Sequence, residues 1–405
     1  MLFNLIRKPK YFLIFTGIIN ILLAVSYVFI YFYQIDAPVT SDRAKLSREE
    51  INLIRENYKS LNFKYLESWV NDALIVKKYI ADSISDKKII IIGDSNALLG
   101  IDSSVIEQKT GLKVVNLATQ GNLSIDYFSY LLKKVITKGD IVVMPIVLDY
   151  YCLNHPYSDW LIVNILAWDK EYFHSMSLSD KAKFIWYTPF EKVLEGVYSI
   201  ATSEKAYDVN EKEVIANFKH ISRKQDFKWR GYSYLSLNEY GDMKGIPAIK
   251  KRFLNQVIYG EFNDDLKYMC DEIFVSDYIA EQLHEIMDLV NEFNAELYLT
   301  WPVTMRSNFF DLRKVSTREK IKKLAEALKE KNIPIYCNPA MFNLDIMFFF
   351  DSIYHPNTDG AKIRSFNLAE CINNIDNEEF PQNQSYTYAI QKVLNQEYIL
   401  SNKRY

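Results

Sequence analysis

The chain has 405 residues, enough for one large domain or two ordinary ones. Its 49% hydrophobic and 15% aromatic content excludes a disordered or fibrous protein. With 48 basic and 51 acidic residues the net charge is −3, so no overall positive field indicates a nucleic-acid partner. The function must therefore be sought in local motifs.

An uncharged segment near the N-terminus predicts a membrane anchor. Residues 11–33 carry no charged side chain, and about 20 apolar residues suffice to span a bilayer. Basic residues lie within 1–10 and acidic residues follow the segment, so the positive-inside rule places residues 1–10 in the cytoplasm. A cleaved signal peptide is the alternative, but the apolar run is long and no small-residue cleavage site ends it. We expect a single-pass protein whose C-terminal part is extracytoplasmic.

Cysteine usage and motif content limit the cofactors. The four cysteines are widely spaced and form no CxxC pair, which excludes a zinc pattern and leaves open one disulfide bond or free thiols. Neither a metal-ligand cluster nor a GxGxxG or P-loop motif occurs. The sequence therefore predicts no metal and no nucleotide cofactor.

An alternation of strands and helices predicts an α/β domain in two pieces, 87–150 and 276–375. Short β-branched or apolar runs typical of buried parallel strands alternate with helical segments. The expected strands are 89–92, 114–117, 141–148, 295–302 and 333–337.

Three further regions flank or interrupt this domain. Residues 34–86 predict a helical stem that follows the anchor. Residues 151–275 are aromatic and helical, and they are too long for a simple crossover, which indicates an inserted subdomain. Residues 376–405 are rich in polar side chains and are expected to form a peripheral tail.

The clearest chemical signal is a serine placed just after the first strand. The run 89–92 breaks into Gly93-Asp94-Ser95, and a helical segment follows. Open α/β sheets bind ligands beyond the carboxyl ends of their strands, and a helix start offers N–H groups to an oxyanion. The alternative is a plain strand–turn–helix junction in which Asp94 or Ser95 caps the helix.

A serine nucleophile needs a base, and one histidine is suitably placed. Four of the five histidines lie in the insertion or in helical stretches, whereas His355 lies after the last strand and before the terminal helix. That loop should emerge at the same sheet edge as Ser95. Asp351, four residues earlier, could orient the imidazole and stabilise its charged form.

Together these residues resemble the SGNH, or GDSL-like, hydrolases over about 88–150 and 290–375. The first block is similar to Gly93-Asp94-Ser95-Asn96, the second to the glycine Gly121 after strand two, and the last to Asp351 with His355. The resemblance implies a flavodoxin-like three-layer α/β/α sandwich with a parallel sheet. It also implies an oxyanion hole made by the N–H groups of Ser95 and Gly121, with Asn122 as a nearby candidate.

The sequence departs from the family in two places. The usual Asp-x-x-His is here Asp-x-x-x-His, with Ser352 at the common aspartate position. The usual Gly-x-Asn-Asp after strand three is replaced by residues 145–151, which hold neither the glycine nor the asparagine. One oxyanion donor is therefore missing or is supplied from elsewhere, with Asn122 and Asn96 as the candidates.

An anchor followed by an SGNH-like domain is similar to bacterial envelope O-acyltransferase accessories, such as the alginate acetylation and teichoic-acid D-alanylation factors. This resemblance implies acyl transfer from an acyl donor to an envelope polysaccharide at the bacterial cell membrane, beside a multispanning acyltransferase. In it Ser95 would be the nucleophile, His355 the base and Asp351 its orienting partner. Two alternatives stay open: a carbohydrate esterase with water as acceptor, and a non-catalytic scaffold for a membrane acyltransferase.

Overall fold

The computed structural model describes residues 69–121, 123–187, 210–259, 268–270, 272–375 and 386–402. The chain divides into two compact units, of which the larger comprises Asp72–Pro156 and Glu211–Tyr405. The smaller comprises Met1–Asn71 and Tyr157–Asn210. Two of the unit boundaries, at 156/157 and 210/211, fall within the expected insertion, and the third, at 71/72, falls within the expected stem. Residues 211–259 belong to the same unit as the sheet.

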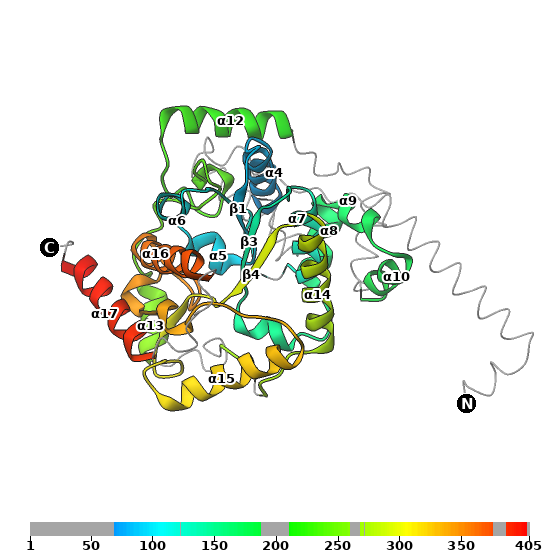
Figure 1. Ribbon diagram of the computed structural model, residues 1–405. Helices are drawn as coiled ribbons and strands as arrows, with labels where there is room; N and C mark the ends of the chain where they lie inside the picture. Colours follow the sequence, from blue (N-terminus) through cyan, green and yellow to red (C-terminus); the bar gives the residue numbers. More distant parts are fainter. Residues whose placement is uncertain are drawn as a thin grey trace, which may run out of the picture. The chain divides into compact units, whose positions relative to one another are not determined.

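A four-stranded parallel sheet forms the centre of the larger unit (Figure 1). Its strands, in the order β2-β1-β3-β4, are β1 (Lys88–Ile91), β2 (Lys113–Asn116), β3 (Ile141–Pro145) and β4 (Glu296–Thr300). Every residue of β1 and β3 is buried, as expected for apolar strands covered on both faces. The predicted α/β class with a parallel sheet is confirmed. The expected strand at 333–337 is reduced to a single parallel bridge between Thr300 and Tyr336.

Helices cover the two faces of this sheet, an arrangement compatible with three α/β/α layers. In Figure 1, α6 (Ser103–Thr110) and α16 (Thr358–Ile375) lie on one side of the strands, with α7 (Ile125–Lys133) and α14 (Asp277–Glu292) on the other. Each helix follows a strand or precedes one, so the chain crosses from face to face between parallel strands.

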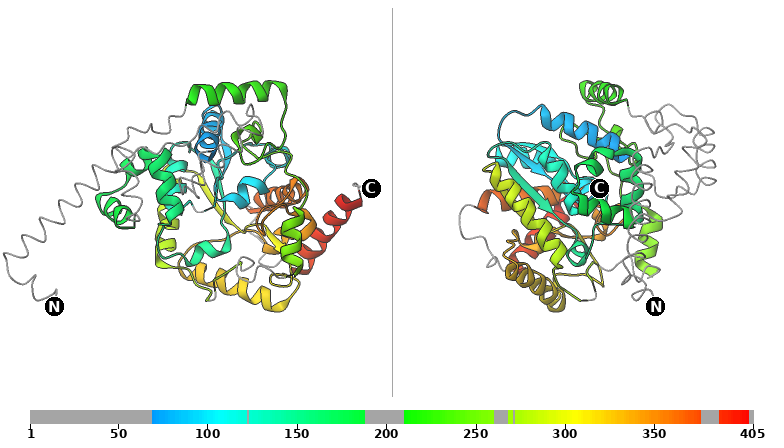
Figure 2. Two further views of the ribbon diagram at one scale, coloured as in Figure 1. Left: turned by 180° about the vertical axis from the view of Figure 1, so that it is seen from behind. Right: turned by 90° about the vertical axis from the view of Figure 1, so that its right-hand side faces the viewer.

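The C-terminal part of the larger unit adds a small second sheet and two helices. Strands β5 (Thr304–Arg306) and β6 (Asn343–Asp345) pair in parallel, and α15 (Val315–Glu330) lies between them in the sequence. Helix α17 (Tyr386–Asn402) packs against α16 (Figure 2), and its Glu397 pairs with Arg306 at 2.5 Å. Residues 386–402 of the expected polar tail thus form a helix that buries Ala389, Val393 and Glu397.

Residues 211–259, which belong to the same compact unit as the sheet, form a run of helical elements. These are α12 (Glu211–Lys224), η3 (Tyr234–Ser236) and α13 (Lys251–Tyr259). The part of the expected stem that the structure describes is α4 (Trp69–Asp82), whose buried Lys77 donates to the carbonyls of Asn116 and Gly241, both at 2.6 Å. Lys77 therefore links α4 by hydrogen bonds to β2 and to the segment 234–244.

The described part of the smaller unit is helical. It contains α8 (Asp159–Trp168), α9 (Lys170–Ser175) and α10 (Leu178–Tyr187). Phe184 lies in edge-to-face contact with Tyr157 and Phe173, which gives this unit an aromatic core.

Two disulfide bonds link the four cysteines. The sequence left open a single disulfide bond or free thiols, and the structure has neither arrangement. Cys152 pairs with Cys270, and Cys337 with Cys371, with Cα–Cα distances of 6.5 and 5.7 Å. None of the described helices is long and apolar enough to cross a bilayer, and the expected anchor at 11–33 lies outside the described residues.

Candidate active site

Ser95 stands on a sharply defined turn between β1 and the short helix α5 (Ser95–Gly100). The buried Asp94 caps this helix, because its carboxylate accepts from the Asn96 N–H at 2.7 Å. The same carboxylate accepts from the Val147 N–H at 3.2 Å, which links the turn to the end of β3. At Gly93 a Cβ would lie 2.9 Å from the Pro145 carbonyl oxygen, so the close approach of the two strand ends requires glycine there.

His355 is held by a compact loop that follows η5 (Ile346–Phe348) and precedes α16. The Phe350 N–H donates to the His355 carbonyl at 2.9 Å, and the His355 N–H donates to Ser352 at 3.2 Å. An antiparallel bridge between Phe349 and Pro356 closes the base of the loop. The backbone of the histidine is therefore fixed from both sides.

The structure brings the three residues expected from the sequence into one hydrogen-bonded chain. His355 Nε2 lies 2.8 Å from Ser95 Oγ, and His355 Nδ1 lies 2.9 Å from Asp351 Oδ1. The side chains of His355 and Asp351 are 17% and 15% exposed, so the pair is shielded but still reachable from solvent. With Nδ1–H donated to the carboxylate, Nε2 is free to accept the serine proton.

The same geometry shows which residue stands at the aspartate position. Asp351, and not Ser352, contacts the imidazole, so the extra residue in Asp-x-x-x-His is absorbed within the loop. Burial raises the pKa of Asp351, but the hydrogen bond and charge of His355 and the Lys250 ammonium outweigh it and leave that pKa below its ordinary value. The carboxylate is therefore ionised at neutral pH.

Two further groups contact Asp351, and sequence reasoning did not find either. The Tyr232 hydroxyl donates to Asp351 Oδ1 at 3.1 Å and lies 3.4 Å from His355 Nδ1. Lys250 Nζ lies 2.5 Å from Asp351 Oδ2. Both belong to a region without strand periodicity or a motif, so no local signal in the sequence could have indicated them.

Of the expected oxyanion donors, Gly121 lies beside the nucleophile. A Cβ on Gly121 would be 3.5 Å from Ser95 Oγ, in ordinary contact. Its N–H donates to the Gln120 side-chain oxygen at 3.0 Å, so this N–H is already hydrogen-bonded to an amide oxygen of the protein. The N–H of Ser95 is among the first of α5 and has no partner within the helix. Asn122 lies outside the described residues.

Asn96 is not suited to replace the oxyanion donor that the Gly-x-Asn-Asp motif usually supplies after strand three. Its side-chain amide nitrogen donates to Asp94 Oδ1 at 2.7 Å and to the Pro145 carbonyl at 3.0 Å, which uses both N–H groups. Its oxygen accepts from Arg364, a fully buried arginine of α16. The expectation of Asn96 as an oxyanion donor is therefore wrong, because the side chain points into this buried network.

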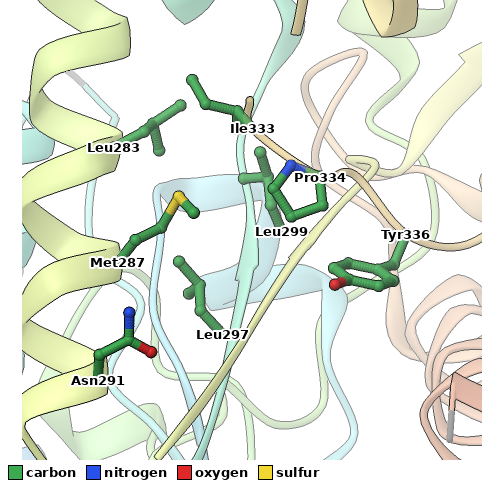
Figure 3. A pocket seen from close by; sticks show the side chains of 8 residues that line it. All are labelled: Leu283, Met287, Asn291, Leu297, Leu299, Ile333, Pro334 and Tyr336. Carbon is green, nitrogen blue, oxygen red and sulfur yellow. The ribbon is translucent and has the colours of Figure 1, made fainter. Parts of the chain in front are cut away.

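No other feature of the described residues competes with this site. Among them, no group of acidic, histidine or cysteine side chains is arranged to hold a metal ion. A mainly apolar pocket lies between α14, β4 and the segment at 333–336 (Figure 3). Its lining residues are Leu283, Met287, Asn291, Leu297, Leu299, Ile333, Pro334 and Tyr336. None of these belongs to the serine–histidine–aspartate site.

A comparison of the chain with models of known protein families gives no match, and a comparison with curated protein sequences gives none either.

Proposed function

We propose that this chain is a membrane-anchored, SGNH-type O-acyltransferase that acylates a cell-envelope polysaccharide outside the cytoplasm. The observation that carries the proposal is His355, whose two ring nitrogens lie 2.8 Å from Ser95 Oγ and 2.9 Å from Asp351 Oδ1. Sheet order supports the SGNH assignment, because β2-β1-β3-β4 is the order of a flavodoxin-like sheet, and Ser95 follows β1 at its switch point.

The chemistry follows from this chain of hydrogen bonds. His355 Nε2 takes the proton of Ser95 Oγ as the oxygen attacks the carbonyl carbon of the acyl donor. The imidazolium, oriented by Asp351, then returns that proton to the departing group of the donor, and the acyl group stays on Ser95. In the second half, His355 takes a proton from a glycan hydroxyl, which attacks the acyl carbon, and Ser95 leaves with its proton restored.

The position of the site outside the cytoplasm is supported by two independent features. The uncharged segment at 11–33, preceded by basic residues, predicts an anchor with this orientation. Cys152–Cys270 and Cys337–Cys371 are both paired, and such bonds persist mainly in oxidising compartments. An anchored site would be held near the membrane, where a multispanning partner could deliver the acyl donor.

The test is covalent trapping of Ser95 in the full chain in detergent. A fluorophosphonate probe should label the wild-type chain at Ser95, with the serine oxygen displacing fluoride from phosphorus. Ser95→Ala should abolish the label, and His355→Ala should slow it by at least 100-fold. Failure of the wild type to react would refute the enzymatic proposal and favour a scaffold.

The choice of acceptor needs a second readout. Cells that carry Ser95→Ala should lose acyl groups from their envelope polysaccharide, whereas a matched exposed-residue control such as Lys251→Met should keep them. If the variant cells instead accumulate acylated glycan, the chain is an esterase, with water as the acceptor of the acyl-enzyme.

A further inference from the structure

The triad carboxylate has two partners that come from outside the α/β elements. Tyr232 donates its hydroxyl to Asp351 at 3.1 Å to Oδ1 and 3.2 Å to Oδ2. The ammonium group of Lys250 lies 2.5 Å from Oδ2. With the His355 ring on Oδ1, both oxygens of the carboxylate are engaged.

Both partners are held in place by their own backbone and ring contacts. The Lys250 N–H donates to the Phe350 carbonyl at 2.8 Å, and its ammonium lies 4.2 Å from the centre of the Phe350 ring. Trp229 contacts Tyr232 and Phe350 edge to face, with ring centroids 5.5 and 5.3 Å apart. The 229–250 segment is thus fastened to the loop that carries Asp351.

We propose that Tyr232 and Lys250 are positioning residues that fix the orientation and charge of Asp351 and so control the reactivity of Ser95. This inference rests on the proposed acyl transfer at Ser95 and deepens it. The acyl transfer needs the carboxylate to present one oxygen, Oδ1, to His355 Nδ1. Tyr232 and Lys250 together hold the other oxygen, Oδ2, away from the imidazole ring. It also means that residues outside the sheet and its crossover helices complete the active site.

The two partners act in different ways. The Tyr232 hydroxyl is a neutral donor, so it fixes geometry in both protonation states of the ring. Lys250 adds a positive charge, and together with His355 it opposes the effect of burial and lowers the pKa of Asp351. The titratable or charged groups that contact this carboxylate are His355, Tyr232 and Lys250. Without Lys250 the carboxylate would take up its proton at a higher pH.

The test measures the rate at which a fluorophosphonate probe traps Ser95 in the full chain, over a range of pH. Tyr232→Phe removes only the hydroxyl and should lower the maximal trapping rate by about tenfold, with little change in probe affinity. Lys250→Met keeps an unbranched side chain over Phe350 but removes the charge. It should move the acid limb of the profile upward by about half to one pH unit. Lys250→Arg should restore the wild-type limb.

Matched controls separate positioning from folding. Lys251→Met alters the exposed neighbouring lysine, and Tyr398→Phe removes a hydroxyl from an exposed tyrosine of α17. Both should react as the wild type does. All variants should unfold within about 2 °C of the wild type, and a variant that unfolds earlier is assayed well below its melting temperature.

The outcomes distinguish this inference from the proposed function. A wild-type chain that is not trapped at Ser95 overturns the acyl transfer itself. A wild type that is trapped, with Tyr232→Phe and Lys250→Met matching it in maximal rate and pH profile, overturns only the positioning roles. An acid limb that Lys250→Met moves upward and Lys250→Arg does not restore likewise contradicts a role for the charge.

Discussion

Arg364 contacts Asn96, the residue directly after the candidate nucleophile, through both arms of its guanidinium group. Nη1 donates to the Asn96 carbonyl at 2.5 Å, and Nη2 donates to Asn96 Oδ1 at 2.7 Å. Burial lowers the pKa of Arg364, and the nearby Asp94 carboxylate opposes that shift. A buried fork from α16 thus supports the turn on which Ser95 stands.

Replacing this arginine should destabilise the domain. Arg364→Met leaves the buried Asn96 Oδ1 without its arginine donor, removes one of the donors to the Asn96 carbonyl and takes the Arg364 charge away from Asp94, which should cost about 2–4 kcal/mol. Arg364→Lys should recover little, because an ammonium cannot reproduce the planar fork. Denaturant unfolding of the full chain measures this, with the exposed Lys362→Met as control. Equal stability of Arg364→Met and the wild type would contradict it.

On the proposed acyl-transfer function, Gln120 should restrain the oxyanion donor at Gly121 before the substrate binds. Its side-chain oxygen accepts the Gly121 N–H that an acyl oxygen would need, so each acylation must first break that hydrogen bond. Gln120→Ala should therefore speed trapping of Ser95 by a small probe about 2- to 10-fold, the equivalent of one neutral hydrogen bond. The exposed Gln108→Ala should have no effect. Slower trapping in Gln120→Ala would show instead that the Gln120 amide helps to bind the oxyanion.

The sequence-based prediction succeeded where short-range signals and strand periodicity coincide. The all-isoleucine run before Gly93 predicts a buried parallel strand, and parallel topology then brings the loop of His355 to the same edge as Ser95. The motif spacing did not decide between Asp351 and Ser352, because loop geometry determines which side chain reaches the ring.

Other parts of the site depend on packing between distant segments, which carries no local pattern. Lys250 and Asp351 are 101 residues apart, and Arg364 and Asn96 are 268 apart. Neither Lys250 nor Arg364 stands in a motif, and an arginine within a helix ordinarily indicates an exposed face. The cysteine pairing could not be predicted from the sequence for the same reason, because widely spaced cysteines leave the connectivity open.

The buried Lys77 gives a pH dependence with a defined sign. Burial lowers its pKa to about 7, although the Asp242 charge opposes the shift, whereas the ordinary value is 10.5. Below pH 7 both folded and unfolded chains carry this proton. Between pH 7 and 10.5 the unfolded chain binds more of it, so stability rises with pH. The free energy of unfolding of the wild type should thus rise over this range relative to Lys77→Met.

Denaturant unfolding at several pH values checks this sign. Lys78→Met, which changes the exposed neighbour in the same helix, should run parallel to the wild type over the whole range. Parallel curves for the wild type and Lys77→Met would mean that the lysine keeps its proton in the folded chain throughout.

The Cys337–Cys371 bond should contribute directly to the stability of the helix that carries Arg364. It joins the segment after the β4 bridge to α16 across a sequence separation of 34 residues. Closing a loop of that length removes entropy from the unfolded chain, worth about 3–4 kcal/mol. Cys337→Ala with Cys371→Ala should lose that amount in denaturant unfolding while keeping Cys152–Cys270.

Alkylation of the unreduced, unfolded wild-type chain, read by mass spectrometry, should find no free thiol. Modification of all four cysteines would contradict both bonds and remove one support for an extracytoplasmic site.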